Sequence, residues 1–447
     1  MNPVLGIGLV LVALGLCFMG LRLLQQLASP HPELLRKLMH VLMGLVASTF
    51  PWLFDAAWPV LLLAGGSLVA LIAVRAGGEA TRSLRGVLHG VERSSWGELL
   101  FPVAIAVIFV LADGNALLYV VPILILTLAD AVAALIGVYY GQFQFSTLEG
   151  SKSLEGSFAF FIVTFLCVHV AVLLFTDAGR LESLLIGLLM GIIVMMFEAV
   201  AWRGLDNLFI PVASYALLET YLVLDAAALT LRLAVILLLV LFLLAWRRRS
   251  TLDDSALIGA GLVAYAAWAI GDLYWLLVPV LTFVAATLLA WREVPERRGN
   301  LHTVYALLAI SGPGLAWLVL HNRGGTAGLF LAYALTFGAH LAMLGVSRAH
   351  FGRAHLALWR LGPPALQGWL VVMVALVLYH GPTPGLGWPA GVAALAMLAA
   401  ALAFYRLQPA LSQCPVTPLR WGRQAMIAAS VSLLGWLSLA GPSAGGA

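Results

Sequence analysis

The most informative polar residue in the sequence is Asp130, which interrupts an otherwise apolar segment. Asp130, Ala134, Gly137 and Gly141 have helical i, i+4, i+7, i+11 spacing, so they share one face of a helix. Small residues on such a face let a second helix or a ligand approach the backbone closely. A carboxylate inside a membrane helix is costly, so we expect Asp130 to bind Mg²⁺, directly or with a phosphate. The alternative is a helix-packing stripe that carries one structural aspartate.

A second cluster follows this segment and contains Lys152, Ser153, Glu155 and Gly156. It stands just before an apolar segment that is expected to be a helix, and the N-terminus of a helix attracts anions. A lysine and a hydroxyl at that place are typical of a phosphate-binding site. No GxxxxGK pattern precedes Lys152, which excludes a Walker A loop. The alternative is that Ser153 only caps the helix.

Three basic residues, Arg36, Lys37 and His40, stand at the entry to another apolar segment. Arg36 and His40 share a helix face with Gly44, because their spacing is i, i+4, i+8. A guanidinium, an ammonium and an imidazole at a membrane surface suit phosphate oxygens. An anchor whose basic side chains reach the lipid headgroups explains the same pattern equally well.

Two further polar clusters are less specific. Glu98 opens an apolar segment after the residues Arg-Ser-Ser-Trp-Gly, where a carboxylate also complements the helix dipole. Glu198 is followed by Asp206 and Asn207, which precede a segment with Pro211 in its first turn. Asp206 or Asn207 could cap that helix or take part in a site, and the pattern leaves both open.

The composition indicates which elements must position these clusters. The chain has 447 residues, of which 62% are hydrophobic and 10% charged, whereas about a quarter of the residues are charged in soluble proteins. Apolar stretches of roughly 17 to 25 residues recur along it, each long enough to cross a bilayer. Lipid requires internally paired backbones, and the stretches lack the alternation of a β-barrel. The sequence therefore predicts an all-α polytopic bundle of about 16 transmembrane helices.

The distribution of lysine and arginine predicts the orientation. With the N-terminus outside, only Arg180, Arg232 and Arg323 of the 24 basic residues fall in outside segments. This arrangement places all the polar clusters at the cytoplasmic face of the inner membrane, in contact with membrane lipids. The net charge of +4 is dispersed along the chain, which argues against a nucleic-acid partner.

The polar motifs, taken together, resemble the CTP-dependent lipid-alcohol kinases, which include dolichol kinase, phytol kinase and CTP-dependent diacylglycerol kinase. The motifs that carry the resemblance occur in order between about residues 30 and 215: ELLRKLMHVLMGL, RSSWGELLFP, DAVAALIGVYYG, KSLEGS and LDNLFIP. This family is part of a wider group that also contains the phosphatidate cytidylyltransferases. Those enzymes end in a His-Gly-Gly-x-x-Asp-Arg-x-x-Asp signature. Here the His-Gly-Gly and the second Asp are missing, which favours a kinase.

The resemblance implies CTP as the phosphoryl donor, Mg²⁺ as the cofactor, and an isoprenoid alcohol or diacylglycerol as the acceptor. It implies that Asp130 holds Mg²⁺ on the triphosphate and that Arg36, Lys37 and Lys152 neutralise its oxygens. Asp206 or Glu155 would orient or deprotonate the lipid hydroxyl. The other residues that it places at the nucleotide are His40, Gly137, Gly141, Ser153, Gly156 and Asn207.

The motifs divide the chain into two expected domains. Residues 1–246 would form the kinase-like membrane domain, and residues 247–447 would form a second helical membrane domain of unknown function. Two other functions remain open at this point. One is synthesis of a CDP-lipid, as in the cytidylyltransferases. The other is lipid transport, which the number of helices suits, although no pair of matching broken helices supports it.

Overall fold

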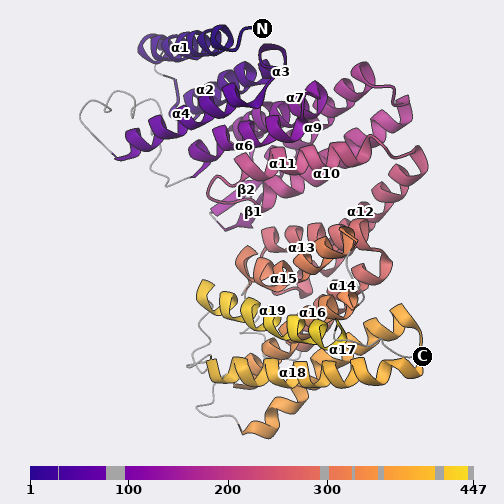
Figure 1. The fold of residues 1–447 in the computed structure, drawn as a ribbon. Coiled ribbons are helices and arrows are strands. Elements are labelled where there is room, and N and C mark those ends of the chain that lie inside the picture. Colours follow the sequence, from indigo (N-terminus) through magenta and orange to yellow (C-terminus); the bar gives the residue numbers. More distant parts are fainter. Residues whose placement is uncertain are drawn as a thin grey trace. The chain divides into compact units, whose positions relative to one another are not determined.

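The computed structural model describes residues 1–28, 30–76, 96–148, 150–291, 302–324, 328–350, 357–407 and 417–440. The chain forms two compact units, residues 1–234 and 235–447 (Figure 1). Within the described ranges, eleven helices are long and apolar enough to cross a membrane, and two shorter apolar helices accompany them. The predicted all-α bundle is confirmed, and the chain is a multi-pass membrane protein.

Unit 1 is built from helices and one short hairpin. Its elements are α1 (Pro3–Ala28), α2 (Pro32–Ser48), α3 (Phe50–Leu53), α4 (Ala57–Ala76), α6 (Gly97–Ala112), α7 (Ala116–Leu124), the π-helical segment η2 (Ile125–Ala129), α8 (Asp130–Tyr140), β1 (Gln144–Thr147), β2 (Gly150–Ser153), α9 (Leu154–Phe175), α10 (Arg180–Val200) and α11 (Asp206–Tyr221). The boundary between the units falls inside α12 (Ala226–Trp246), whereas the sequence placed a domain boundary after residue 246.

The segments α7, η2 and α8 form one continuous helix with a change of winding in its middle. Asn115 caps its start by accepting a hydrogen bond from the Leu118 amide at 3.1 Å. The π-helical turn follows Pro122, which has no amide hydrogen to donate. π-Helical turns inside α-helices are frequent at functional sites. Asp130 is the first residue after this turn.

Close packing brings α2 against the π-helical turn. A Cβ atom on Gly44 would overlap the Thr127 side chain, so glycine is required for the two segments to approach as they do. Thr127 is itself buried and donates its hydroxyl to the Ile123 carbonyl. The contact at Gly44 places the preceding two turns of α2 beside the start of α8.

The hairpin of β1 and β2 is an addition to the all-α prediction. The two strands are antiparallel, with Phe145 opposite Lys152 and Gln144 opposite Ser153. Phe145 is buried and anchors the hairpin. Ser153 ends β2 and caps α9 by accepting a hydrogen bond from the Gly156 amide at 3.1 Å. The hairpin thus holds Lys152 immediately before the N-terminus of α9.

Unit 2 is organised around one central helix. Its elements after α12 are η3 (Arg247–Arg249), α13 (Asp254–Ala266), the π-helical segment η4 (Ala267–Gly271), α14 (Leu273–Trp291), α15 (Val304–Asn322), α16 (Leu329–His350), η6 (Leu358–Leu361), α17 (Gly362–His380), η7 (Pro384–Leu386), α18 (Gly387–Leu407) and α19 (Pro418–Ala440). Helix α16 packs against α14, α15, α17, α18 and α19. Its apolar window is completely buried, so α16 forms the core of this unit.

Candidate active site

The centre of the candidate site is an ion pair between α2 and α8. The Lys37 ammonium donates to Asp130 Oδ2 at 2.6 Å, and the two side chains are only 6% and 15% exposed. The carboxylate expected to be costly inside the membrane therefore has a buried cation beside it. The sequence placed both residues in the nucleotide site, and the structure brings them into direct contact although they stand far apart in the chain.

His40 completes this cluster on the next turn of α2. Its Nε2 atom donates to the Leu126 carbonyl at 3.1 Å and lies 3.8 Å from Asp130 Oδ2. The imidazole ring packs on Phe101 of α6, with ring centroids 4.7 Å apart. The carbonyl of Leu126 lies in the π-helical turn, so this turn orients the imidazole and Asp130 together.

Arg36 lies beside the cluster and is more exposed. Its guanidinium makes two hydrogen bonds to Glu33, at 2.6 and 3.0 Å, and its side chain is 51% exposed. This contact joins residues one turn apart on α2, as is common for opposite charges on a helix. The arrangement leaves the guanidinium at the surface of the site, where it can reach a ligand without leaving its helix.

A second ion pair joins the hairpin to α10. The Lys152 ammonium donates to Glu198 Oε1 at 2.6 Å and also to the Glu198 carbonyl. Burial disfavours the charged ammonium, but Glu198 and Asp206 outweigh it and raise the pKa of Lys152 above its usual value. Lys152 is therefore positively charged at neutral pH.

Glu198 is a site residue that the sequence did not assign. It was recognised as a polar residue beside an apolar segment, but nothing in its spacing indicated Lys152 as its partner. Its second oxygen, Oε2, is buried and has no hydrogen-bond partner among the described residues. A buried carboxylate oxygen without a partner is available to a ligand or a cation.

The small residues Gly137, Gly141 and Gly156 let α8 and the start of α9 pack closely. A Cβ atom on Gly156 would lie 2.9 Å from the Ala133 carbonyl, and one on Gly141 would lie 2.7 Å from Ser153 Cβ. The stripe on α8 therefore contacts a second helix in this structure. Binding of the nucleotide at these glycines stays a prediction, and the packing they permit fixes Ser153 and Lys152 relative to α8.

Glu155 faces the hairpin. Its carboxylate accepts hydrogen bonds from the Phe143 amide at 3.1 and 3.4 Å. This contact closes the turn between α8 and β1 onto the first turn of α9.

Asp206 and Asn207 stand at the start of α11, directly after a turn in which Arg203 has a positive φ of 54°. Asp206 Oδ1 accepts a hydrogen bond from the Asn207 amide at 3.0 Å. Asn207 donates its side-chain amide to the Gly97 carbonyl at 2.8 Å, and the Trp96 amide donates to the Arg203 carbonyl at 2.9 Å. These bonds tie α11 to the start of α6.

The motif that precedes α6 is only partly described. Glu98 lies in the first turn of α6, where its carboxylate can complement the helix dipole. The same carboxylate lies 4.0 Å from the guanidinium of Arg75 in α4. The arginine and the two serines at positions 93 to 95 lie outside the described residues.

Electrostatic interactions connect the two ion pairs with Asp206. The carboxylates of Asp130 and Asp206 both interact electrostatically with the Lys152 ammonium and with the Arg36 guanidinium. The residues from α2, α8, β2 and α11 therefore belong to one charged region. Among the described residues, no three acidic, imidazole or thiol groups converge as a complete metal site. Mg²⁺ often binds through one or two carboxylates and the phosphates of its substrate, and this region has carboxylates for that mode.

An apolar cavity of about 460 Å³ lies beside the charged region. It is lined by side chains from α1, α2, α3, α4 and α6. Its lining includes Met43, one turn from His40, and Phe101, whose ring packs on His40. The cavity lining is thus connected to the Lys37–Asp130 pair by way of Phe101, which packs on His40, and His40, which lies 3.8 Å from Asp130.

Comparisons with known proteins give one informative match. A stretch of 216 residues is 27% identical to the phytol kinase of Synechocystis sp., and it covers 47% of this chain and 88% of that protein. No family model matches the chain, and no solved structure gives a significant match. Unit 1 thus combines buried opposite charges with an adjoining apolar cavity, and nearly half of the chain is similar to a phytol kinase.

Proposed function

We propose that unit 1 is a lipid-alcohol kinase that transfers the terminal phosphoryl group of CTP to a membrane lipid alcohol. The observation that carries this proposal is the contact between a charged region and an apolar cavity through His40 and Phe101. A phosphorylated lipid requires both environments within one site. The similarity to a phytol kinase supports the same reaction class.

The apolar cavity is the part of the site that would receive the lipid. Along α4 its lining extends from Val60 to Leu71, a rise of about 16 Å at 1.5 Å per residue. That length suits an extended hydrocarbon chain that lies along the helices. A lipid in this position has its hydroxyl at the end marked by Met43 and Phe101, beside the imidazole of His40. An isoprenoid alcohol fits this description, since it has one chain and a terminal hydroxyl.

The charged region is the part that would receive the triphosphate. Lys152 and Arg36 supply positive charge for its oxygens, and phosphoryl transfer depends mainly on positioning and neutralisation of charge. Lys37 contacts Oδ2 of Asp130, so Oδ1 is the oxygen that would hold Mg²⁺. Glu198 Oε2 is a second oxygen suited to this role. Bound Mg²⁺ would neutralise the developing charge on the phosphoryl oxygens.

Proton transfer from the lipid hydroxyl needs a carboxylate near the cavity end of the site. Asp206 is the stronger candidate, because it interacts electrostatically with both Arg36 and Lys152. Glu155 is bound to the Phe143 amide and holds the hairpin. We therefore assign the orienting or basic role to Asp206 and a positioning role to Glu155.

The Lys and Arg distribution supports a position of this site at the cytoplasmic face of the inner membrane, where CTP is available. The assignment of CTP, rather than another triphosphate, rests on the resemblance of the five motifs. The other partners are the membrane lipids that surround both units.

The test is an activity assay with the purified full-length protein. The protein is incubated in lipid nanodiscs with Mg²⁺, terminally labelled CTP or ATP, and a panel of phytol, a polyprenol and diacylglycerol. We expect label to appear on a lipid monophosphate, faster with CTP than with ATP. The Asp206→Asn variant should lose most of this rate, whereas Asp55→Asn, which changes an exposed carboxylate, should keep it.

Two results would overturn the proposal. One is formation of a CDP-lipid from CTP and phosphatidate, without label transfer to any alcohol, which would make the protein a cytidylyltransferase. The other is movement of a lipid across the membrane by protein that transfers no label from either nucleotide, which would make it a transporter.

A further inference from the structure

The apolar cavity of unit 1 has a definite direction, which shows where a lipid chain inside it would end. Its head end is marked by Met43 of α2 and by Phe101 of α6, which packs on the imidazole of the charged region. Helix α4 runs toward that end, because Arg75 in its last turn lies 4.0 Å from Glu98 in the first turn of α6. The lining residue Val60, near the start of α4, therefore lies at the opposite end of the cavity.

The far end of the cavity is closed by aromatic rings. Phe50 of α3, which follows α2 on the side away from the head end, lines the cavity and is buried. The ring of Phe54 packs edge-on against Phe50, with ring centroids 5.5 Å apart. Phe54 is held in turn by α1, because a Cβ atom on Gly6 would lie 2.7 Å from its ring. We call Phe50 and Phe54 the floor of the cavity.

The long sides of the cavity differ in exposure. Ala47, Ala64 and Ile105 line the inner side and are buried. Leu11 of α1 and Leu62 of α4 line the outer side, and they are 56% and 58% exposed. In a membrane such exposed leucines face lipid tails, which are equally apolar. An acceptor lipid can therefore enter sideways between α1 and α4, and its chain then extends toward the floor.

The volume of the cavity determines how much chain it holds. An apolar cavity of about 150 Å³ binds one benzene molecule, which corresponds to about 25 Å³ per carbon atom. On this scale a cavity of about 460 Å³ receives roughly 18 carbon atoms. One chain of about 15 to 20 carbon atoms therefore fits. Diacylglycerol has two such chains, and a long polyprenol has several times as many carbon atoms.

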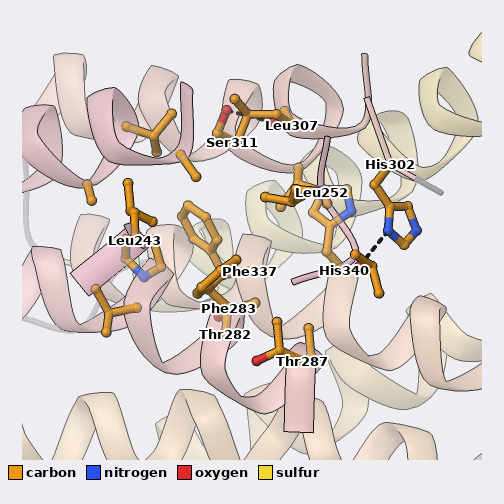
Figure 2. A pocket seen from close by; sticks show the side chains of 18 of the residues that line it. Leu243, Leu252, Thr282, Phe283, Thr287, His302, Leu307, Ser311, Phe337 and His340 are labelled. Carbon is orange, nitrogen blue, oxygen red and sulfur yellow. Dashed lines mark hydrogen bonds between the residues drawn. The ribbon is translucent and has the colours of Figure 1, made fainter. Parts of the chain in front are cut away.

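A second cavity, in unit 2, does not provide additional room for a lipid chain. Its volume is about 110 Å³, and side chains from α12 to α16 line it. Figure 2 shows His302 and Leu243 at opposite ends of this cavity, with Phe283 and Phe337 between them. On the same scale it receives roughly four carbon atoms. We therefore place the acceptor chain in the cavity of unit 1.

We propose that Phe50 and Phe54 limit the chain length of the acceptor. The site then accepts single-chain alcohols of up to about 20 carbon atoms and rejects both long polyprenols and diacylglycerol. The proposal rests on the proposed function of unit 1, and it adds the residues that select among lipid alcohols.

The physical basis is the difference between filling the cavity and exceeding it. Lipid tails are as apolar as the cavity, so a methylene that moves from the bilayer into the cavity gains little free energy. A chain that is too long must displace the ring of Phe50, which is packed against Phe54. Forcing extra atoms into a close-packed interior is unfavourable. We therefore expect a rate that changes little up to the limiting length and falls steeply beyond it.

The experiment measures chain-length preference with the full-length protein in lipid nanodiscs. The probes are prenyl alcohols of two, three, four, six and eleven isoprene units, together with diacylglycerol, each with Mg²⁺ and terminally labelled CTP. We expect similar kcat/KM values for the alcohols of three and four units. The values for six and eleven units and for diacylglycerol should be at least tenfold lower.

Two variants of the cavity should move this limit in opposite directions. Phe50→Ala removes a ring of the floor and should raise the six-unit to four-unit ratio of kcat/KM at least fivefold. Ala64→Leu fills the cavity from its inner side and should lower the ratio of four-unit to two-unit activity at least fivefold. The control is Phe109→Ala, which removes a ring that packs edge-on against Tyr119 at 5.4 Å and does not line the cavity. It should leave both ratios unchanged, because loss of stability alone lowers all rates together.

Three results would overturn the proposal. One is a wild-type rate with the eleven-unit alcohol equal to that with four units, which would show that the chain leaves sideways between α1 and α4. Another is a Phe50→Ala protein with the wild-type ratio. The third is an unchanged ratio in Ala64→Leu, which decides the question where Phe50→Ala does not fold.

Failure of the proposed kinase reaction has a different signature. Label would then reach none of the alcohols, whatever their length. The same alcohols are therefore also added to the full-length protein in detergent without nucleotide, and the shift in melting temperature is recorded. A shift that is lost beyond four isoprene units in the wild type, and restored for six units by Phe50→Ala, would support the floor as a limit on binding without the reaction. A shift that is independent of length would overturn it.

Discussion

The Lys37–Asp130 pair allows a structural and a catalytic role to be separated with three variants: Asp130→Asn, Lys37→Met and the double change. Either single change leaves one buried charge without its counter-ion. The pair is joined at 2.6 Å and its side chains are 6% and 15% exposed, so the estimate for buried pairs applies. We expect each single variant to lose roughly 3 to 5 kcal/mol of unfolding free energy.

The double variant distinguishes the two roles. Removing both charges removes the unpaired one, so unfolding free energy should recover to within about 1 to 2 kcal/mol of the wild type. Phosphoryl transfer should not recover, because neither Mg²⁺ nor the triphosphate regains its charged partner. A loss of about 3 kcal/mol in transition-state stabilisation corresponds to a rate roughly a hundredfold lower.

The assay combines thermal unfolding in detergent with the initial rate of label transfer from CTP to a lipid alcohol. The reasoning is refuted if the double variant is stable and turns over at close to the wild-type rate, because the pair would then be purely structural. Single variants that keep the unfolding free energy of the wild type would contradict the expected cost of an unpaired buried charge.

Three further predictions follow from the same unit. Gly141→Ala brings a Cβ atom to within 2.7 Å of Ser153 Cβ and should cost about 1 to 3 kcal/mol of stability in chemical denaturation, whereas Gly65→Ala, which meets open space, should cost nothing measurable. Because the pKa of Lys152 is raised, the lysine should keep its charge, and the protein the stability that depends on this charge, until the pH rises above the usual lysine pKa of about 10.4. An inflection in the pH–rate profile near pH 8 to 9 that disappears in Lys152→Arg would contradict this. In a background without the three native cysteines, Ser151→Cys should react with an impermeant thiol reagent only after permeabilisation, and reaction in intact cells would reverse the predicted orientation.

The fold was largely predictable because lipid leaves few alternatives for an apolar chain. Each predicted span corresponds to a helix, since an apolar stretch of that length in a membrane must pair its backbone internally. The hairpin of β1 and β2 was not predicted. It lies in a short polar connection, where the pairing of Phe145 with Lys152 depends on how α8 and α9 are placed.

The residue types of the candidate site were predictable, but their partners were not. Asp130 was identifiable because a carboxylate in an apolar segment costs free energy. Its partner was not, because Lys37 is 93 residues away in the sequence. The pairing of Lys152 with Glu198 is equally non-local. Spacing within one helix reveals a shared face, whereas contacts between helices depend on packing, such as the approach of Gly44 to Thr127. The cavity of unit 2 that is lined by side chains from α12 to α16 brings five helices together, so no local sequence pattern indicates it.

The complete burial of α16 has a consequence for biosynthesis. During translation α16 emerges before α17, α18 and α19, three of the helices that later surround it. Until they are made, His340 and Thr336 must face lipid, the translocon or an insertion chaperone. Ribosomes that pause between α16 and α17 would prolong this exposed state. The burial of these polar side chains is therefore expected to be complete only after α19, the last helix that packs on α16, has been inserted.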